Sequence, residues 1–98
     1  EVKKMNDGPN NLPHIGWNEV DFNKDDILFN DIKNKQDFYF IHSYEFIPND
    51  HKDVLSISHF NSKFVSIVKK DNCYGIQFHP EKSLKKGLKI IENFLKIK

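Results

Sequence analysis

The chain has 98 residues, the size of one domain or of a piece of one, which excludes a second domain. Charged residues make up 30% of the sequence and nine residues are Phe, a composition typical of a soluble globular protein rather than a disordered one. The net charge is +1 with basic residues spread along the chain, so neither a nucleic acid nor a membrane is indicated as a partner.

The cysteine content and the apolar runs indicate where the protein works. Cys73 is the single cysteine and cannot form an internal disulfide, which favours a reducing compartment. No apolar run approaches the roughly 18 to 20 residues that span a bilayer, and the start has no signal-peptide core. We therefore expect a cytoplasmic protein. Because the sequence begins with Glu rather than Met, we also expect a cut amino terminus.

The first elements are an arm and a strand. Residues 1–11 are polar and rich in turn formers, which predicts a lead-in arm that packs on no core. Residues 15–22 predict a short strand with Ile15 and Trp17 on one face. Gly16 in this strand allows another backbone to come close to it.

The middle of the chain is rich in β-branched and aromatic residues. Residues 24–34 predict a short helix or a helical turn. Residues 38–44 predict a central strand buried on both faces, because the run is aromatic and too short for a packed helix. Residues 54–60, 63–70 and 73–78 are joined by two-residue polar connections, which predicts a three-stranded antiparallel meander.

The end of the chain predicts a helix. Its apolar residues fall on one stripe, with Lys residues opposite. The stripe consists of Leu84, Leu88, Ile91, Phe94 and Leu95. Ser83 is a candidate N-cap. Lys85 and Lys86 oppose the helix dipole in the first turn, which suggests either a function or simply a solvated face.

The candidate catalytic residues are His79 and Glu81, where a hydrophobic strand ends in His-Pro-Glu before the helix. Pro80 restricts the geometry of its neighbours. A carboxylate that accepts a hydrogen bond from one imidazole nitrogen leaves the other nitrogen to take a proton from a nucleophile. The alternative is a surface His beside a helix-capping Glu.

The string Gly-Ile-Gln-Phe-His-Pro-Glu-Lys-Ser at residues 75–83 resembles the catalytic segment of class I, triad-type glutamine amidotransferases. The resemblance implies an α/β, flavodoxin-like mixed sheet, here as a partial domain with the meander and the carboxy-terminal helix. It also implies that a cysteine attacks the side-chain amide of glutamine and releases ammonia. In that reaction His79 is the general base and acid, and Glu81 orients it.

Two further strings narrow the resemblance. Leu-Pro-His-Ile-Gly-Trp-Asn at residues 12–18 and Tyr-Phe-Ile-His-Ser-Tyr at residues 39–44 resemble the glutaminase subunit of imidazole glycerol phosphate synthase, in the same order. The resemblance implies a glutaminase that supplies ammonia to a barrel-shaped cyclase subunit in histidine biosynthesis, as a heterodimer and without a cofactor. It implies that Ser43 and Tyr44 border the glutamine. Four positions match residues that face the cyclase: Trp17, Tyr39, His42 and Lys82.

The sequence departs from the family in one respect. A complete glutaminase of this type is roughly twice as long, and its first half carries a Gly-rich oxyanion loop and a Gly-x-Cys-x-Gly nucleophile elbow, so residues 1–98 resemble the carboxy-terminal half. Cys73 has no flanking glycines and lies roughly 20 Å from His79 along a strand, too far for a hydrogen bond. We therefore expect this chain alone to be inactive, with an exposed sheet edge along residues 38–44.

Three other interpretations remain open at this point. One is a paralogous amidotransferase of surface-sugar biosynthesis, which this half of the sequence does not distinguish. Another is a non-catalytic remnant of the fold that binds a barrel partner. A metal site is the third, but the five histidines show no i, i+4 pair and no Cys/His ligand spacing, so we assign none.

Overall fold

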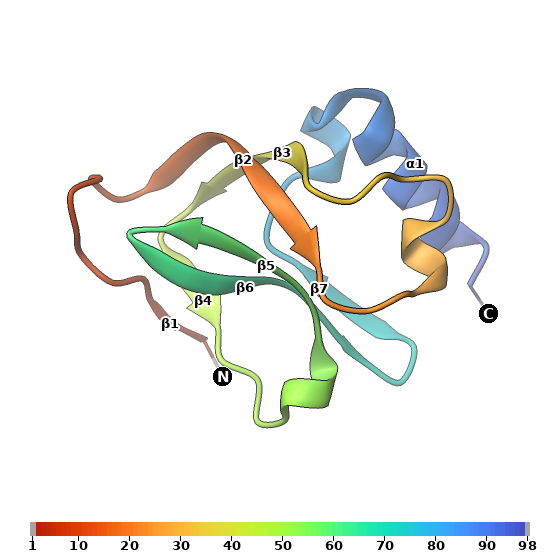
Figure 1. Cartoon of the computed structure of the whole chain (residues 1–98), viewed down its shortest axis with the longest axis horizontal. Coiled ribbons are helices and arrows are strands. Elements are labelled where there is room, and N and C mark those ends of the chain that lie inside the picture. The colour runs from red at the N-terminus through yellow and green to blue at the C-terminus, as the bar shows by residue number, and fades with distance from the viewer. Residues whose placement is uncertain (1, 98) are drawn as a thin grey trace.

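A computed structural model describes residues 2–97. Its seven-stranded sheet has the order β1-β4-β6-β5-β2-β3, with β7 beside β6 (Figure 1). The strands are β1 (Val2–Lys4), β2 (His14–Phe22), β3 (Gln36–His42), β4 (Tyr44–Phe46), β5 (Val54–Phe60), β6 (Ser62–Lys70) and β7 (Cys73–Ile76). The helices are α1 (Leu84–Leu95) and the 3-10 turns η1 (Ile27–Phe29), η2 (His51–Asp53) and η3 (Pro80–Lys82).

The predicted fold class, α/β with an antiparallel meander and a carboxy-terminal helix, is confirmed. Strands β5, β6 and β7 pair antiparallel in succession. The other strand pairs between residues 2 and 97 are also antiparallel, so the mixed character expected of the sheet does not occur within these residues. The two connections turn at Asn61 (φ 66°) and Asp71 (φ 56°). Asn and Asp tolerate this left-handed conformation better than other non-glycine residues, so the polar connections form tight hairpins.

The arm at residues 1–11 is more structured than its composition predicts. Strand β1 pairs with β4, and Met5 is only 4% exposed within the hydrophobic core. The Asn61 amide of the β5–β6 turn donates to the carbonyls of Asn6 (3.2 Å) and Asn10 (2.9 Å). The expectation that the arm packs on no core is therefore wrong, because Met5 lies in the core. The Asn61 side chain, 55 and 51 residues away from Asn6 and Asn10, fixes the path of the arm.

Strand β3 differs from its prediction in burial and in position. Phe38 and Phe40 are fully buried, whereas Ile41 points outward and is 39% exposed, so the strand is buried on one face only. It is the last strand of the sheet order rather than a central one. The predicted edge along residues 38–44 does lie at an edge of the sheet as far as His42, whereas Tyr44 belongs to β4, which lies between β1 and β6.

Gly16 on β2 is required by conformation and not by a close neighbour. Its φ is +127°, which other residues rarely adopt. Within the described chain nothing lies within 4 Å of the position that a Cβ would take. Within residues 2–97, no atom outside the immediate chain neighbours therefore occupies the space that Gly16 leaves open.

The hydrophobic core lies between the β2–β3 hairpin, the meander and one side of α1. Its members come from the strands, from α1 and from the segments between them: Met5, Val20, Leu28, Phe29, Phe38, Phe40, Leu55, Phe64, Ile67, Phe78 and Ile90.

The predicted helical turn, η1, brings Leu28 and Phe29 into this core. It is fixed by Asp26, whose carboxylate accepts from the Leu28 N–H (3.0 Å), Lys69 Nζ (2.8 Å) and the Tyr74 hydroxyl (2.7 Å).

Asp26→Asn is expected to lower the free energy of unfolding by about 2 kcal/mol, because it removes the charge from a nearly buried, multiply bonded carboxylate. Burial alone raises the pKa of Asp26, but the bonds from Lys69, Leu28 and Tyr74 lower it overall. Thermal unfolding at pH 7 measures the loss. The matched control is Asp50→Asn, an exposed residue that caps η2 through the Lys52 N–H. Equal effects of the two substitutions would contradict the role given to Lys69 and Tyr74.

Helix α1 packs through a different face from the one its apolar stripe predicts. Gly87, Ile90 and Asn93 are buried, and the Asn93 amide donates to the carbonyls of Leu28 (2.9 Å) and Asn30 (2.8 Å). Most of the predicted stripe instead faces outward: Leu84, Leu88 and Leu95 are 69%, 59% and 75% exposed. These three leucines are called the outer leucine face below. An exposed apolar stripe of this kind marks a contact surface.

Candidate active site

His79 and Glu81 lie where β7 has ended and the η3 turn begins. His79 Nδ1 is 3.1 Å from Glu81 Oε2, and both side chains reach the surface. The pKa of Glu81 is lowered, first by its own backbone N–H and then by His79. Because an ionised carboxylate only accepts, the bond places the proton on Nδ1 and leaves Nε2 of neutral His79 available as a base.

The preceding residues anchor this turn in the core. Phe78 is buried, with its ring centroid 4.5 Å from that of Phe38 and 5.7 Å from that of Phe40. The His79 N–H donates to the Tyr39 carbonyl at 2.8 Å. The turn is therefore attached to the outer edge of β3, part of the sheet edge expected along residues 38–44.

Ser43 and Tyr44, the predicted glutamine neighbours, follow β3. His42 bonds to this segment directly, and His14 bonds to His42. His42 Nδ1 donates to the Tyr44 carbonyl at 2.9 Å, and the Ser43 carbonyl accepts from the Met5 N–H at 2.8 Å. Because His42 uses Nδ1 as donor, its neutral ring accepts at Nε2 from His14 Nδ1 (2.9 Å). The two rings thus form a bonded chain under the Ser43–Tyr44 segment.

The His14 ring is enclosed by neighbouring side chains. Its ring stacks on Phe40 (4.8 Å) and Phe60 (4.3 Å), and its Nε2 lies 3.3 Å from the Asn18 amide. Burial, and then neighbouring His42, lowers the pKa of His14 from 6.5 to about 4. Burial also lowers the pKa of His42, opposed by its bond to Tyr44 and assisted by nearby His79. Both rings are therefore neutral at pH 7.

Three of the four residues predicted to face a partner have surface-accessible side chains, and His42, only 8% exposed, does not. Trp17 and Tyr39 are register partners on β2 and β3, and their rings meet edge to face at 5.6 Å. Lys82 is exposed beside Glu81. Lys86 was not singled out as a site residue, yet its Nζ lies 5.5 Å from the Trp17 ring centroid, so one first-turn lysine has an aromatic neighbour.

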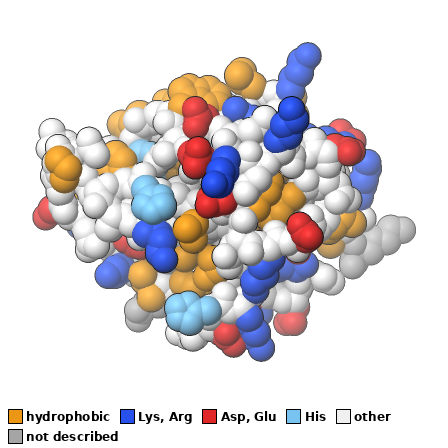
Figure 2. Space-filling model, in the orientation of Figure 1, with side chains coloured by type: hydrophobic (Ala, Val, Ile, Leu, Met, Phe, Trp, Pro, Cys, Tyr) orange, Lys and Arg blue, Asp and Glu red, His pale blue; other side chains and the backbone are white. Residues whose placement is uncertain are grey.

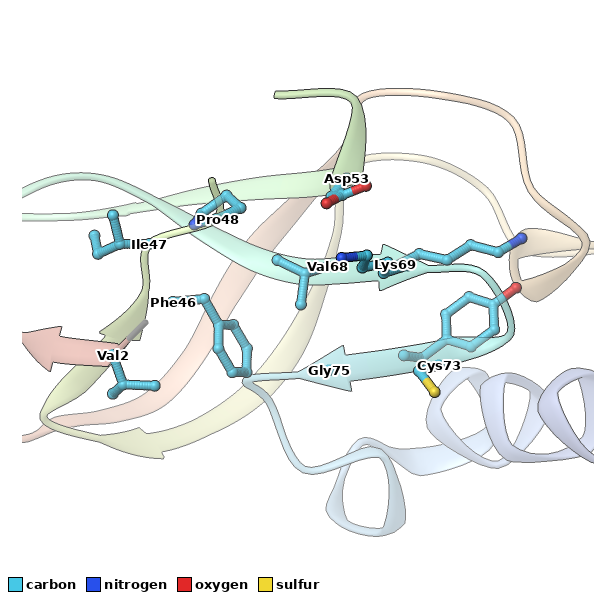
Figure 3. A pocket seen from close by; sticks show the side chains of 11 residues that line it. Val2, Phe46, Ile47, Pro48, Asp53, Val68, Lys69, Cys73 and Gly75 are labelled. Atoms are coloured by element: carbon cyan, nitrogen blue, oxygen red, sulfur yellow. The ribbon is translucent and has the colours of Figure 1, made fainter. Parts of the chain in front are cut away.

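Cys73 lies away from the His79 turn. It is exposed at the start of β7, next to the hairpin that turns at Asp71. Figure 3 shows Cys73 at the wall of a mostly apolar pocket of about 310 Å³, which also includes Phe46 and Val68. His79 and Glu81 do not line this pocket. The thiol and the imidazole therefore lie in different parts of the surface.

The surface carries no concentrated basic patch on the face shown in Figure 2, where lysines are interspersed with acidic and hydrophobic side chains. Among residues 2–97, no helix is long and apolar enough to cross a membrane. No three His, Cys, Asp or Glu residues in the described chain gather as a metal site.

Comparison with known proteins identifies the family. The model of the "Glutamine amidotransferase class-I" family matches residues 5–97. The chain is 53% identical, over 99% of its length, to the imidazole glycerol phosphate synthase subunit HisH of Pelagibacter ubique, of which it covers 48%. It is 50% identical, over 88% of its length, to the HisH subunit of Methanocaldococcus jannaschii, of which it covers 43%. It thus spans about half the length of these curated relatives, and it belongs to the class I glutamine amidotransferase family.

Proposed function

We propose that this chain is the carboxy-terminal half of a glutaminase of the imidazole glycerol phosphate synthase type. The observation that carries the proposal is the His79–Glu81 pair, which leaves His79 Nε2 free to accept a proton. Similarity to HisH subunits over nearly the whole chain supports the same assignment. Glutamine is the substrate, and glutamate and ammonia are the products.

In this reaction a thiol loses its proton to His79 Nε2 and attacks the side-chain amide carbon of glutamine. The protonated His79 then donates to the leaving nitrogen, which departs as ammonia, and water hydrolyses the glutamyl thioester. Glu81 stabilises the imidazolium and fixes its orientation. Ser43 and Tyr44 border the glutamine, and no cofactor takes part.

The nucleophile comes from an amino-terminal half with a Gly-x-Cys-x-Gly elbow. Cys73 is unsuited to the role because it lies beyond the β6–β7 hairpin, away from the His79 turn. This amino-terminal half is proposed to pack on the β3 edge and on the outer leucine face, because β3 ends the sheet and the leucine face is an exposed apolar stripe. The present chain joined to such a half is called the complete glutaminase below.

The ammonia is delivered to a barrel-shaped cyclase subunit in histidine biosynthesis, in the cytoplasm. The proposed interface consists of Trp17, Tyr39, His42 and Lys82. Trp17, Tyr39 and Lys82 offer accessible side chains on the side of the molecule that carries the His79 turn. His42 is buried and supports this surface through its bond to the Tyr44 carbonyl. An interface next to the turn shortens the path that ammonia travels to the acceptor.

Lys82→Glu in the complete glutaminase is expected to weaken cyclase binding at least about fivefold, because charge reversal repels an acidic partner group. Pull-down with the cyclase subunit measures this, with Lys70→Glu at the far end of β6 as the matched control. Equal binding of the two variants would remove Lys82 from the interface.

The same preparation separates an enzyme from a non-catalytic binder. An enzyme both binds the cyclase and releases ammonia from glutamine, whereas a binder only does the first. Retained cyclase binding by a folded complete glutaminase that releases no ammonia would refute the proposed activity and leave the binding intact.

A further inference from the structure

We propose that Ser83 is a positioning residue for His79, acting through a hydroxyl that ties the catalytic turn to β3. The inference rests on the proposed function, since it assigns a task to the turn that carries the base. Ser83 occupies the N-cap position of α1, where its side chain makes no capping bond. Its hydroxyl instead donates to the His79 carbonyl at 2.7 Å and accepts from the Tyr39 N–H at 3.0 Å. The side chain is fully buried.

The turn therefore bonds to both backbone groups, the N–H and the carbonyl, of one β3 residue, Tyr39. The His79 N–H donates to the Tyr39 carbonyl (2.8 Å), and the Tyr39 N–H donates to the Ser83 hydroxyl. This is the pattern in which one residue of an antiparallel strand exchanges two bonds with its neighbour, except that a serine hydroxyl replaces one backbone carbonyl. A hydroxyl is suited to this task because it donates and accepts at once.

Helix α1 closes the turn from the other side. A Cβ on Gly87 would lie 1.9 Å from the Pro80 carbonyl oxygen and 2.7 Å from Ser83 Cβ, so only glycine allows this approach. The Gly87 N–H also donates to the Ser83 carbonyl at 3.2 Å. The five residues from His79 to Ser83 are thus fixed between a strand edge and a helix.

This attachment matters because few contacts outside the turn fix the side chains of His79 and Glu81. The side chains of His79 and Glu81 are 37% and 57% exposed, and they bond chiefly to each other. The location of His79 Nε2 relative to a thiol on another segment therefore depends on the backbone of the turn. A displacement of about 1 Å in such a constellation can cost about a hundredfold in rate.

Ser83→Ala in the complete glutaminase is expected to lower kcat by about ten- to a hundredfold, with KM within about threefold. The matched control is Ser56→Ala, which removes another fully buried hydroxyl, bonded to Ser66 at 2.7 Å in the meander. The control is expected to keep kcat within about twofold. If both variants lower kcat equally, or if Ser83→Ala raises only KM, the positioning role is wrong.

Hydrogen exchange of the present chain distinguishes this proposal from the proposed function. Ser83→Ala is expected to speed exchange of the Tyr39 amide, while Ser56→Ala leaves it unchanged. Unchanged exchange in Ser83→Ala would overturn the attachment. If Ser83→Ala does not fold, NMR of the unaltered chain replaces this test. A slowly exchanging Ser83 hydroxyl proton close to the Tyr39 amide supports the proposal, and a rapidly exchanging one overturns it. An inactive complete glutaminase with a protected Tyr39 amide would refute the function but not the attachment.

Discussion

His79→Ala in the complete glutaminase is expected to lower kcat for glutamine hydrolysis by about 10³- to 10⁴-fold, with KM within about threefold. In the proposed reaction the imidazole takes the thiol proton at Nε2 and returns it to the leaving nitrogen, and the Glu81 bond at Nδ1 keeps Nε2 free for this. The substitution removes both transfers but leaves the proposed glutamine contacts in place. Steady-state measurement of ammonia release across glutamine concentrations gives the two constants.

The control for this substitution is His59→Ala, because His59 is an exposed histidine on β5 with no part in the proposed site. It is expected to leave both constants within about twofold. Glu81→Gln should fall between the two variants, since the imidazole remains but its orienting charge is lost. A His79→Ala enzyme that is as active as His59→Ala would refute the role of His79.

The present chain is expected to lose roughly 3 kcal/mol of unfolding free energy through His14 as the pH falls from about 6.5 to about 4. The His14 pKa is lower in the folded chain than in the unfolded one, so the unfolded state binds the proton first. The contribution is present in full above the unfolded pKa and is lost as the pH falls toward the folded value. His42 has a lowered pKa and adds in the same direction.

Urea unfolding at several pH values measures this loss. His14→Gln removes the titrating ring and is expected to flatten the pH dependence between pH 4 and 6.5. His51→Gln, at an exposed histidine in η2, is the control and should leave the curve unchanged. Parallel curves for the unaltered chain and His14→Gln would show that the buried pair does not control acid stability.

The local features of the fold were predictable and the long-range ones were not. Hairpins at Asn61 and Asp71 follow from neighbouring residues, so the meander was predicted closely. The burial of Ile41 and Leu88 depends on what covers each face, and a local pattern of apolar residues does not contain that information. Both were expected to face a core, and both instead face outward.

The candidate site divides in the same way. His79 and Glu81 are two residues apart, so their contact follows from the chain geometry around Pro80. The bond from Tyr39 to Ser83 spans 44 residues and the His14–His42 contact spans 28, so both require the register of distant elements. The sequence therefore predicted the proposed base, its orienter and the Ser43–Tyr44 segment. It did not predict the groups that hold these residues in place.

The central claim is that this chain supplies the His and Glu of a glutaminase whose cysteine lies on another segment. The most direct test measures ammonia release from glutamine by the present chain alone and after addition of an amino-terminal half with the Gly-x-Cys-x-Gly elbow. We predict no enzyme-like rate alone, and a rate in the mixture that disappears when the elbow cysteine or His79 is replaced. Enzyme-like release by the chain alone that requires Cys73, or an assembled mixture that stays inactive, would contradict the claim.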